Sequence, residues 1–468
     1  MTKLTVVLAL CLMTGLAADG QVFTTIANFN GTNGEAPDTS LVQGIDGHLY
    51  GTTIGGGRNN GGTVFKMSRS GKITTLYSFC AQLACIDGEA PLGPVVLSTD
   101  GNFYGVTQMG GESEGCPFSS CGTVYKMTPL GDLTTLYKFC AQENCPDGFL
   151  PSGGLVRATD GDFYGATSDG GDFPCKGYGC GTVFKITPGG NLTTLHNFNG
   201  SEGYAPNAPL IQATDRKLFG VTFSGTIFDM TLGGQFTPVF VFDYFDGSQP
   251  EDGIIEDNKG SFYGTTSIGG GYGEGTVFEM NQGGSVTTIY NFCALPKCAD
   301  GSAPFAGLIQ ATDGNFYGTT VVGGASQNGT VFRITPSGVL TTLHSFNGSD
   351  GQNPDGSLFQ ATDGKLYGTT PTMENAGCCG TVFSLDMGLG PFVTFVLPYG
   401  KMGQTGGILG QGLTGTTSVM VNGIPANFTV ISDTFIKATV PVGATTGYVT
   451  VTTPTGALTS NVPFHVIR

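Results

Sequence analysis

The sequence predicts an all-β protein: a seven-bladed β-propeller with four-stranded blades, followed by an immunoglobulin-like β-sandwich. Three observations lead to this fold class. A block of sequence recurs seven times at a period of about 53 residues. Each copy holds four short runs rich in Thr, Val, Ile, Phe and Tyr, the residues that strands favour. Gly supplies 79 of the 468 residues, which is typical of a chain with many tight turns.

Composition and charge exclude several classes of protein. Hydrophobic residues make up 39% of the chain, enough for a large core, so general disorder is excluded. Gly does not stand at every third position, which excludes collagen. The net charge of −16 should repel nucleic acid and anionic membranes, so we expect neither as a partner.

Residues 1–18 have the pattern of a secretory signal peptide. Lys3 precedes an apolar run over 4–16, and the small residues Ala17 and Ala18 offer a cleavage site. A retained N-terminal anchor is the alternative. No other segment has the apolar length of a transmembrane helix, so we expect no membrane span after cleavage.

The cysteines indicate an oxidising compartment. Removal of the leader takes away Cys11 and leaves 12 cysteines, ten of them in five C-x4-C pairs. Zinc sites usually use a C-x2-C spacing with histidines or a second pair nearby, so zinc is the weaker alternative. An even number of cysteines behind a signal peptide is typical of extracytoplasmic proteins. The expected disulfides are Cys80–Cys85, Cys116–Cys121, Cys140–Cys145, Cys175–Cys180 and Cys293–Cys298, with a vicinal Cys378–Cys379 bridge as a weaker sixth.

The sixth copy shows the four predicted strands most clearly, at 308–312, 316–320, 329–334 and 340–346. Asp-Gly joins the first run to the second in most copies, and a Gly-containing turn joins the third to the fourth. Both are hairpin signals, because Gly accepts a positive φ. Four antiparallel strands at this period are typical of a propeller blade; a parallel β-helix, with shorter coils and no hairpins, is the alternative.

The ends of the repeat region predict a closed ring. The chain begins with a lone fourth-type run at 22–29, and the seventh copy ends after its third-type run at 380–385. The first strand can therefore complete the last blade, which removes two open sheet edges. The first strand of each blade is then the innermost and the fourth the outermost.

Strand alternation places the long connections on one face. From the Phe that ends a fourth run to the next Pro there are 8 residues in four copies and 12 in three. Those three copies carry a C-x4-C pair, and the other two pairs lie in lengthened connections between second and third runs. Each disulfide would pin an insertion and contribute about 2 kcal/mol by the loop-entropy model. Long loops on a rigid scaffold usually carry binding, so we expect a ligand on this face.

Residues 391–468 have a separate pattern of short alternating strands, which predicts an immunoglobulin-like sandwich. Motifs such as 410–413, 419–423 and 447–453 resemble the IPT/TIG family of Ig-like domains. The resemblance implies a spacer or adhesion module of a bacterial surface protein. The domains expected are therefore a leader at 1–18, a propeller at 21–388 and an IPT/TIG domain at 391–468.

The repeats also resemble a family. The blocks Asp-Gly-x-Phe-Tyr-Gly-Thr-Thr and Gly-Thr-Val-Phe-Lys-Ile-Thr-Pro are similar to the GloVer (Gloeo/Verruco) tandem repeat of bacterial secreted proteins, over about residues 21–386. That family has no assigned activity, so the resemblance implies secretion and no particular chemistry.

One position of the innermost strand forms a polar ring that could line a central channel. Arg157 and Glu256 are its charged members, and Arg157, Glu256, Gln310 and Gln360 are the candidate binding residues. Side-chain hydrogen bonding between blades is the structural alternative. The full ring is Gln43, Leu97, Arg157, Gln212, Glu256, Gln310 and Gln360.

No catalytic set is predicted. His196 and His344 occupy the fourth-strand place that Tyr holds in other copies, and we expect them to pack there. Acids that precede Gly in first-to-second turns are turn residues. Four loop acids recur on the decorated face, where calcium is possible although no Asp-x-Asp-x-Asp-Gly spacing exists; we expect no other cofactor. These loop acids are Asp87, Asp147, Asp300 and Asp350.

The sequence therefore favours a secreted or cell-surface, non-catalytic binding protein whose partner is an extracellular polysaccharide or protein. The alternative is an extracellular carbohydrate-active enzyme that uses carboxylates near the channel mouth. Propellers host both kinds of function, so the fold alone does not choose between them.

Overall fold

The computed structural model describes residues 21–112, 116, 120–173, 175, 178–372 and 379–467. This part of the chain is all-β and contains no α-helix, only two 3₁₀ turns, η1 (Leu83–Cys85) and η2 (Pro296–Cys298). None of its helical segments is long and apolar enough to cross a membrane. The expected leader lies outside the described residues.

The repeat region forms seven four-stranded antiparallel sheets within the described residues. In each sheet the strands follow chain order, apart from the sheet that contains both ends of the region. The first strands are β2 (Val42–Gln43), β6 (Val96–Leu97), β10 (Phe149–Arg157), β14 (Ile211–Gln212), β18 (Ile255–Glu256), β22 (Ile309–Gln310) and β26 (Phe359–Gln360). The second strands are β3 (Leu49–Thr53), β7 (Phe103–Thr107), β11 (Phe163–Asp169), β15 (Leu218–Val221), β19 (Phe262–Thr266), β23 (Phe316–Thr320) and β27 (Leu366–Thr370).

The third strands are β4 (Thr63–Met67), β8 (Thr123–Met127), β12 (Thr182–Ile186), β16 (Thr226–Met230), β20 (Thr276–Met280), β24 (Thr330–Ile334) and β28 (Thr381–Asp386). The fourth strands are β5 (Ile73–Ser78), β9 (Leu133–Lys138), β13 (Leu192–Asn197), β17 (Phe236–Val241), β21 (Val286–Asn291) and β25 (Leu340–Ser345), with β1 (Val22–Asn28) as the fourth strand of the last sheet.

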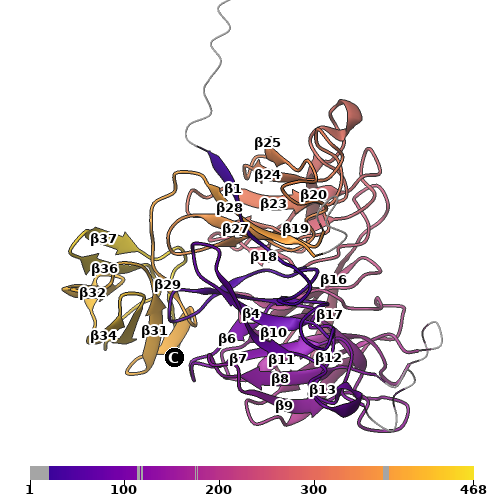
Figure 1. Cartoon of the computed structure of the whole chain (residues 1–468), viewed down its shortest axis with the longest axis horizontal. Coiled ribbons are helices and arrows are strands. Elements are labelled where there is room, and N and C mark those ends of the chain that lie inside the picture. Colours follow the sequence, from indigo (N-terminus) through magenta and orange to yellow (C-terminus); the bar gives the residue numbers. More distant parts are fainter. Residues whose placement is uncertain are drawn as a thin grey trace, which may run out of the picture.

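The N-terminal strand completes the last sheet, as the sequence predicts. β1 pairs antiparallel with β28, with Val22 opposite Asp386 and Asn28 opposite Thr381. The two strands lie side by side in Figure 1, although about 350 residues separate them in sequence. This pairing covers the edge that β28 would otherwise expose.

The recurring residues of each copy have a shared packing reason. In the sixth copy, a Cβ built on Gly318 would lie 2.6 Å from the Phe332 ring of the neighbouring strand, so only Gly fits beside that ring. Thr320 and Thr330 share a buried hydroxyl–hydroxyl hydrogen bond of 2.8 Å at the end of the same strand pair. Burial of the paired hydroxyls explains why Thr ends the second strand in this copy.

The C-terminal segment folds into two four-stranded sheets and a parallel pair. Their inner faces share one core, which includes Ile408, Val419, Ile436 and Val451. One sheet has the order β29-β31-β35-β34, the other β33-β32-β36-β37, and β30 pairs with β38. The strands are β29 (Thr394–Phe395), β30 (Tyr399–Lys401), β31 (Thr405–Leu409), β32 (Ser418–Val421), β33 (Ile424–Pro425), β34 (Phe428–Ser432), β35 (Phe435–Thr439), β36 (Val449–Thr453), β37 (Gly456–Thr459) and β38 (His465–Ile467).

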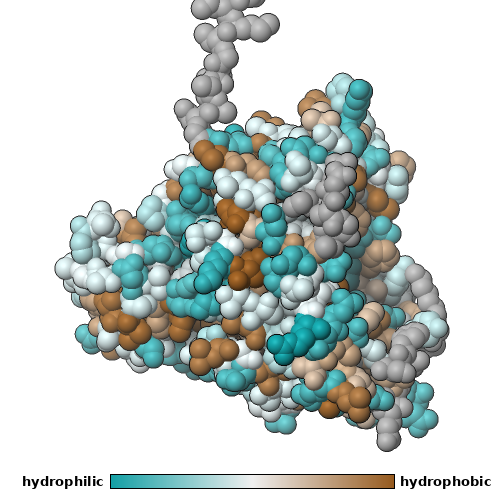
Figure 2. Space-filling view, viewed as in Figure 1, coloured by the Kyte–Doolittle hydropathy of each residue, from teal (hydrophilic) through white to brown (hydrophobic). Residues whose placement is uncertain are grey.

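These C-terminal sheets lie against the turns between first and second strands of the repeats (Figure 1). The Thr434 hydroxyl donates to the Ile45 carbonyl at 2.7 Å, and the Tyr399 hydroxyl donates to the Arg157 carbonyl at 2.9 Å. Leu409 and Phe435 join a core cluster with side chains of the first repeats. On the face shown in Figure 2, apolar and polar surface alternate, with apolar surface gathered near β34, where Ile431 is exposed. The turn face of the repeats is therefore partly covered, and the loop face is not covered by these sheets.

Candidate functional site

The five C-x4-C pairs form the disulfides that the sequence predicts, between Cys80 and Cys85, Cys116 and Cys121, Cys140 and Cys145, Cys175 and Cys180, and Cys293 and Cys298. The weaker Cys378–Cys379 expectation lies outside the described residues, because Cys378 is not among them.

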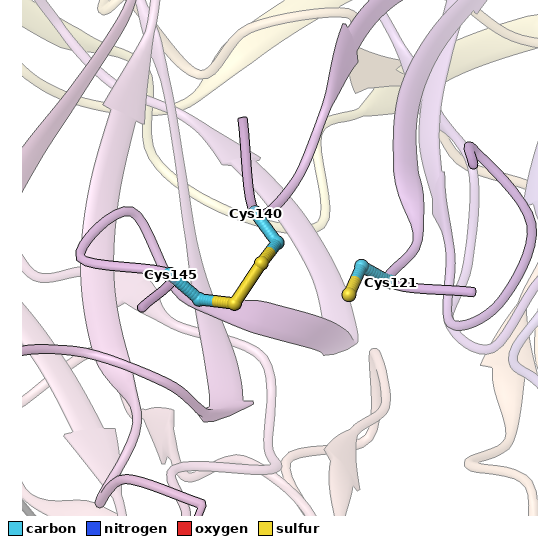
Figure 3. A group of neighbouring side chains, drawn as sticks. All are labelled: Cys121, Cys140 and Cys145. Carbon is cyan, nitrogen blue, oxygen red and sulfur yellow. A yellow bond between two sulfur atoms is a disulfide. The ribbon is translucent and has the colours of Figure 1, made fainter. Parts of the chain in front are cut away.

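Two of these disulfides are neighbours. The sulfur of Cys121 points toward the Cys140–Cys145 bridge, and the three sulfur atoms lie within 4.8 Å of one another (Figure 3). All three belong to disulfides, so none is a thiolate that could hold a metal ion. The cluster therefore staples two adjacent connections of the loop face.

The recurring loop acids order their own loops. Asp87 accepts hydrogen bonds from the Tyr77 hydroxyl at 2.8 Å and from the backbone N–H groups of Ala81 and Gln82. Asp300 repeats this pattern with Tyr290, and Asp147 accepts from the Tyr137 hydroxyl and one backbone N–H. Such bonds to backbone amides fix the loops that the disulfides also close.

The two fourth-strand histidines take over the role of that tyrosine. His344 Nε2 lies 2.9 Å from an Asp350 oxygen, and His196 Nε2 lies 2.8 Å from a Glu202 oxygen. The His344 ring also stacks on Phe23, with ring centroids 3.6 Å apart. Burial lowers the pKa of both imidazoles, although the neighbouring carboxylates oppose it. These contacts agree with the packing role expected from their position.

The predicted polar ring of the innermost strands, here called the turn-end ring, links neighbouring sheets. Gln212 accepts from the Thr159 N–H at 2.8 Å, and Gln360 accepts from the Thr312 N–H at 3.0 Å, each from the preceding repeat. Glu256 accepts from both the N–H and the hydroxyl of Thr214, at 2.8 and 2.6 Å.

The remaining members of the turn-end ring complete this picture. Gln43 accepts from the N–H and hydroxyl of Thr362, which joins the first repeat to the last. Arg157 donates to the hydroxyls of Ser98 and Thr99, both at 2.6 Å. Gln310 donates within its own turn, to the carbonyl of Gly314. Five of the seven members thus make the inter-repeat hydrogen bonds of the structural alternative, whereas Gln310 bonds within its own turn and Leu97 has no polar side chain.

Three of the four candidate binding residues of this ring also face cavities beneath the C-terminal sheets. Arg157 and Glu256 line a cavity of about 820 Å³ together with Tyr399 and His465. Glu256 and Gln310 line another of about 720 Å³, and Gln360 lines neither. A ligand role for the four candidates stays a prediction.

A cavity of about 400 Å³ lies at the opposite end of the sheets. Every repeat contributes to its lining, and in each repeat one lining residue directly follows the recurring proline at or near the start of the first strand. We call it the loop-end cavity. Residues of all seven repeats therefore meet at this one cavity. The seven residues are Asp38, Leu92, Ser152, Asn207, Glu251, Phe305 and Asp355.

Four carboxyl groups line the loop-end cavity, from Asp38, Glu251, Asp252 and Asp355, and its lining contains no Lys, Arg or His. Burial raises the pKa of Asp355 to about 7. Burial also raises the pKa of Glu251, against hydrogen bonds from Asn207 and Ser267 that lower it. Desolvation without a nearby cation disfavours the charged form, which is why both shifts are upward.

Three side-chain oxygens of this lining are buried and accept no hydrogen bond within the described part of the chain. They are the Oδ1 atoms of Asp38, Asn207 and Asp355. By contrast, Asp252 accepts from the N–H groups of Gly253 and Gly307 and from the Ser357 hydroxyl, so it ties together the loops of three repeats. A buried acceptor without a partner costs about 1–3 kcal/mol, so the three free oxygens are a place where a donor would be stabilised.

Sequence reasoning missed this cavity. The recurring proline was visible, but the residue after it is Asp, Leu, Ser, Asn, Glu, Phe or Asp in the successive copies. Such variation at one position of otherwise similar repeats was the available signal. A residue that packs the repeat core should be similar in every copy, whereas residues that build one asymmetric site need not be.

Solved structures with a similar arrangement are propeller-like all-β proteins. The extracellular domain of a putative hybrid two-component system from Bacteroides thetaiotaomicron matches 94% of this chain at 11% identity and a TM-score of 0.51. A second such extracellular domain from that organism matches 96% at 10% identity and a TM-score of 0.50. This chain spans 57% and 60% of their lengths. A putative 6-phosphogluconolactonase from Bacteroides uniformis has a TM-score of 0.46 at 18% identity, with 69% of this chain and 88% of that chain covered.

The likeness to the two extracellular domains defines the class as a propeller-like, all-β fold. The chain belongs to the family described as the Gloeobacter/Verrucomicrobia repeat, whose profile matches residues 12–175, 114–307 and 294–417. No curated protein matches the sequence.

Proposed function

We propose that the chain is a secreted or cell-surface, non-catalytic binding protein whose ligand enters the loop-end cavity. In this proposal residues 21–388 form a seven-bladed propeller, residues 391–468 an IPT/TIG-type Ig-like spacer, and residues 1–18 a leader that is removed. The five disulfides support an oxidising, extracellular location. The extracellular domains with a similar fold are consistent with that location.

The cavity that all seven repeats line is the observation that carries this proposal. Its volume of about 400 Å³ falls within the range of small-molecule sites. It lies at the loop end of the sheets, where its wall is held by hydrogen bonds such as those of Asp252, which accepts from the loops of three repeats. A rigid wall reduces the entropy lost on binding, as expected for a preformed site.

A ligand panel tests this proposal on the purified, oxidised chain. Glycan-array binding and thermal-shift measurements, with and without calcium, should identify at least one small polar ligand that binds the wild-type protein. Ser40→Trp should abolish that binding, because Ser40 lines the cavity and an indole would fill it. Asp132→Asn, an exposed change in the turn between β8 and β9, serves as the control and should bind normally. Binding that survives Ser40→Trp would place the ligand elsewhere.

A carbohydrate-active enzyme is the second candidate, and one observation favours it. Asp355, with its pKa raised to about 7, would be partly protonated at neutral pH and lies beside other carboxyl groups, and glycoside hydrolysis uses such a pair of carboxyl groups as acid and base or nucleophile. Release of reducing sugar from an oligosaccharide panel, lost in Asp355→Asn, would support catalysis. No release alongside measurable binding supports the non-catalytic function.

A further inference from the structure

We infer that the loop-end cavity takes an organic cation, an amino sugar or a small amine, rather than a neutral sugar or a metal ion. This inference rests on the proposed binding function of that cavity. The 18 residues that line it supply four carboxyl groups and no basic side chain. An entering ammonium group would therefore meet uncompensated negative charge in a partly desolvated site, where electrostatic attraction exceeds that at an open surface.

The free hydrogen-bonding groups match an ammonium donor. Three side-chain oxygens of lining residues, the Oδ1 atoms of Asp38, Asn207 and Asp355, are buried and accept no hydrogen bond within the described residues, so a donor in the cavity reaches them once these side chains rotate toward it. An alkylammonium group carries three donors and no acceptor. A neutral hydroxyl offers one donor and would leave more of these acceptors unpaired.

These acceptors lie at two places around the cavity. Asp38 and Asp355 stand on the adjoining loops of the first and last repeats, which touch, since a Cβ on Gly356 would lie 3.2 Å from the Thr39 backbone. The other place is Asn207, whose Nδ2 donates to Glu251 at 3.1 Å and leaves its Oδ1 free. In a ring of seven, the fourth and fifth repeats lie across from the first. Two separated acceptor sites favour a molecule with some length over a single ion.

The arrangement disfavours a metal ion for a second reason. Among the described residues, the only groups of three His, Cys, Asp or Glu ligand atoms within 4.8 Å of one another contain disulfide cysteines, and none contains an acid of this cavity. Calcium needs six to eight oxygen ligands at about 2.3–2.6 Å, and carboxylates spread around a cavity do not provide that shell.

The apolar part of the lining suits the carbon skeleton of such a ligand. Phe305 is 37% exposed and lines the cavity together with Leu92 and Pro94. An aromatic face within about 6 Å of an ammonium group adds cation–π attraction. Acidic acceptors on some repeats and apolar side chains on others would orient an amphiphilic cation.

The test compares matched probes by isothermal titration at pH 8 and low salt, using the whole oxidised chain. The probes are glucosamine, glucose, N-acetylglucosamine, 1,4-diaminobutane and calcium chloride. We expect glucosamine or diaminobutane to bind at least tenfold more tightly than glucose and N-acetylglucosamine. The double variant Asp38→Asn/Asp355→Asn should weaken the amine at least tenfold while leaving the fold intact by circular dichroism, and Asp132→Asn should change nothing. If the double variant does not fold, Glu251→Gln provides the same comparison.

The outcomes separate this inference from the proposed function. Equal or tighter binding of a neutral sugar that Ser40→Trp abolishes overturns the cationic ligand and keeps the binding function. If calcium binds the wild-type protein and the double variant removes that binding, the cavity is a metal site and the inference of an organic cation is wrong. No binding of any probe, or amine binding that survives both Ser40→Trp and the double variant, overturns the inference. Loss of affinity as the pH falls through about 7 would add support, because Asp355 then becomes neutral and Asp38, Glu251 and Asp252 are the only other titratable groups of the lining.

Discussion

The two ends of the repeat sheets each carry a ring of mostly polar residues, and the two rings differ in how many of their oxygens accept hydrogen bonds. At the turn end, the carbonyl or carboxylate oxygens of Gln43, Gln212, Glu256 and Gln360 accept hydrogen bonds from a neighbouring repeat. At the loop end, oxygens of Asp38, Asn207 and Asp355 are buried and accept none from the described residues. Each ring has one residue per repeat, so the difference lies in how their hydrogen bonds are completed.

This difference separates stabilising polar groups from candidate binding groups. A paired ring joins the sheets and its removal should cost stability. Unpaired acceptors cost stability, so these three oxygens are the groups that the proposed ligand would pair. One exception at the turn end is Gln43 Nε2, which is buried without a partner even though its Oε1 accepts three hydrogen bonds.

The largest effect is expected from Asp355→Asn at the loop end. Its raised pKa means that the folded state holds the proton more tightly than the unfolded chain, so stability falls as pH rises from the ordinary carboxyl range to about 7. Removing the charge should therefore raise the free energy of unfolding by roughly 2–4 kcal/mol at pH 8, with little change near pH 3. Urea unfolding at the two pH values measures this, and a loss of stability at pH 8 would contradict the assignment of unpaired charge.

At the turn end, Gln43→Ala should have the opposite sign. It removes one oxygen that accepts from the Thr362 N–H, the Thr362 hydroxyl and Arg69, so stability should drop by about 2–3 kcal/mol. Ligand binding at the loop end should stay unchanged. The matched control is Gln310→Ala, whose hydrogen bond stays within its own turn and whose loss should cost less than half as much. If both variants lose the same free energy of unfolding, the inter-repeat hydrogen bonds of the ring do not stabilise the contact between repeats.

The disulfides of the loop face should contribute less than the Gln43 contacts. Replacing the Cys293–Cys298 pair by two serines should lower stability by about 2 kcal/mol, because a short closed loop regains entropy when unfolded. Thermal unfolding under oxidising conditions measures the loss of stability. Dithiothreitol should then destabilise the double variant less than the wild type, because the variant has no disulfide to reduce in this loop. Asp300 still accepts three hydrogen bonds there, so the loop should stay ordered and binding should weaken only slightly.

The smallest effect is expected from Asp100→Asn, in a turn next to the turn-end ring. Burial alone would raise the pKa of Asp100, but hydrogen bonds from Asn102, Lys126 and Tyr104 lower it below its ordinary value. This carboxylate therefore stabilises the fold at neutral pH and loses that contribution as pH falls through its lowered pKa. Since the side chain is 38% exposed, the variant should lose less than about 1 kcal/mol at pH 7. If Asp100→Asn instead gained stability, as expected for Asp355→Asn, carboxylates at the two ends of the sheets would not differ in their effect on stability.

The periodicity of the sequence was sufficient to predict the strand order and the pairing of the two ends. Hairpin turns and strand alternation are local properties, so four strands per copy follow from each copy alone. The lone run at 22–29 and the missing fourth run after 385 then led to the pairing of β1 with β28. The two cysteines of each disulfide are five positions apart, so these pairings are equally local, and all five disulfides are present.

The candidate site was not predictable in the same way. Glu256 and Arg157 stood out because they are charged members of a polar position, yet they bond to Thr214 and Ser98 of the preceding repeats. Asp355 and Asn207 gave no such signal, since acids and amides after proline are ordinary loop residues. Their burial depends on how seven loops converge.

Local chemistry thus decided the strands, the turns and the disulfides of this protein, because those features involve residues that are close along the chain. The way in which loops of all seven repeats meet at one cavity determines which polar groups keep a partner and which do not. Asp38 and Asp355 are 317 residues apart in sequence and stand on adjoining loops. Hydrogen-bond satisfaction and desolvation depend on such distant neighbours, so only the tertiary structure distinguishes the paired ring from the unpaired one.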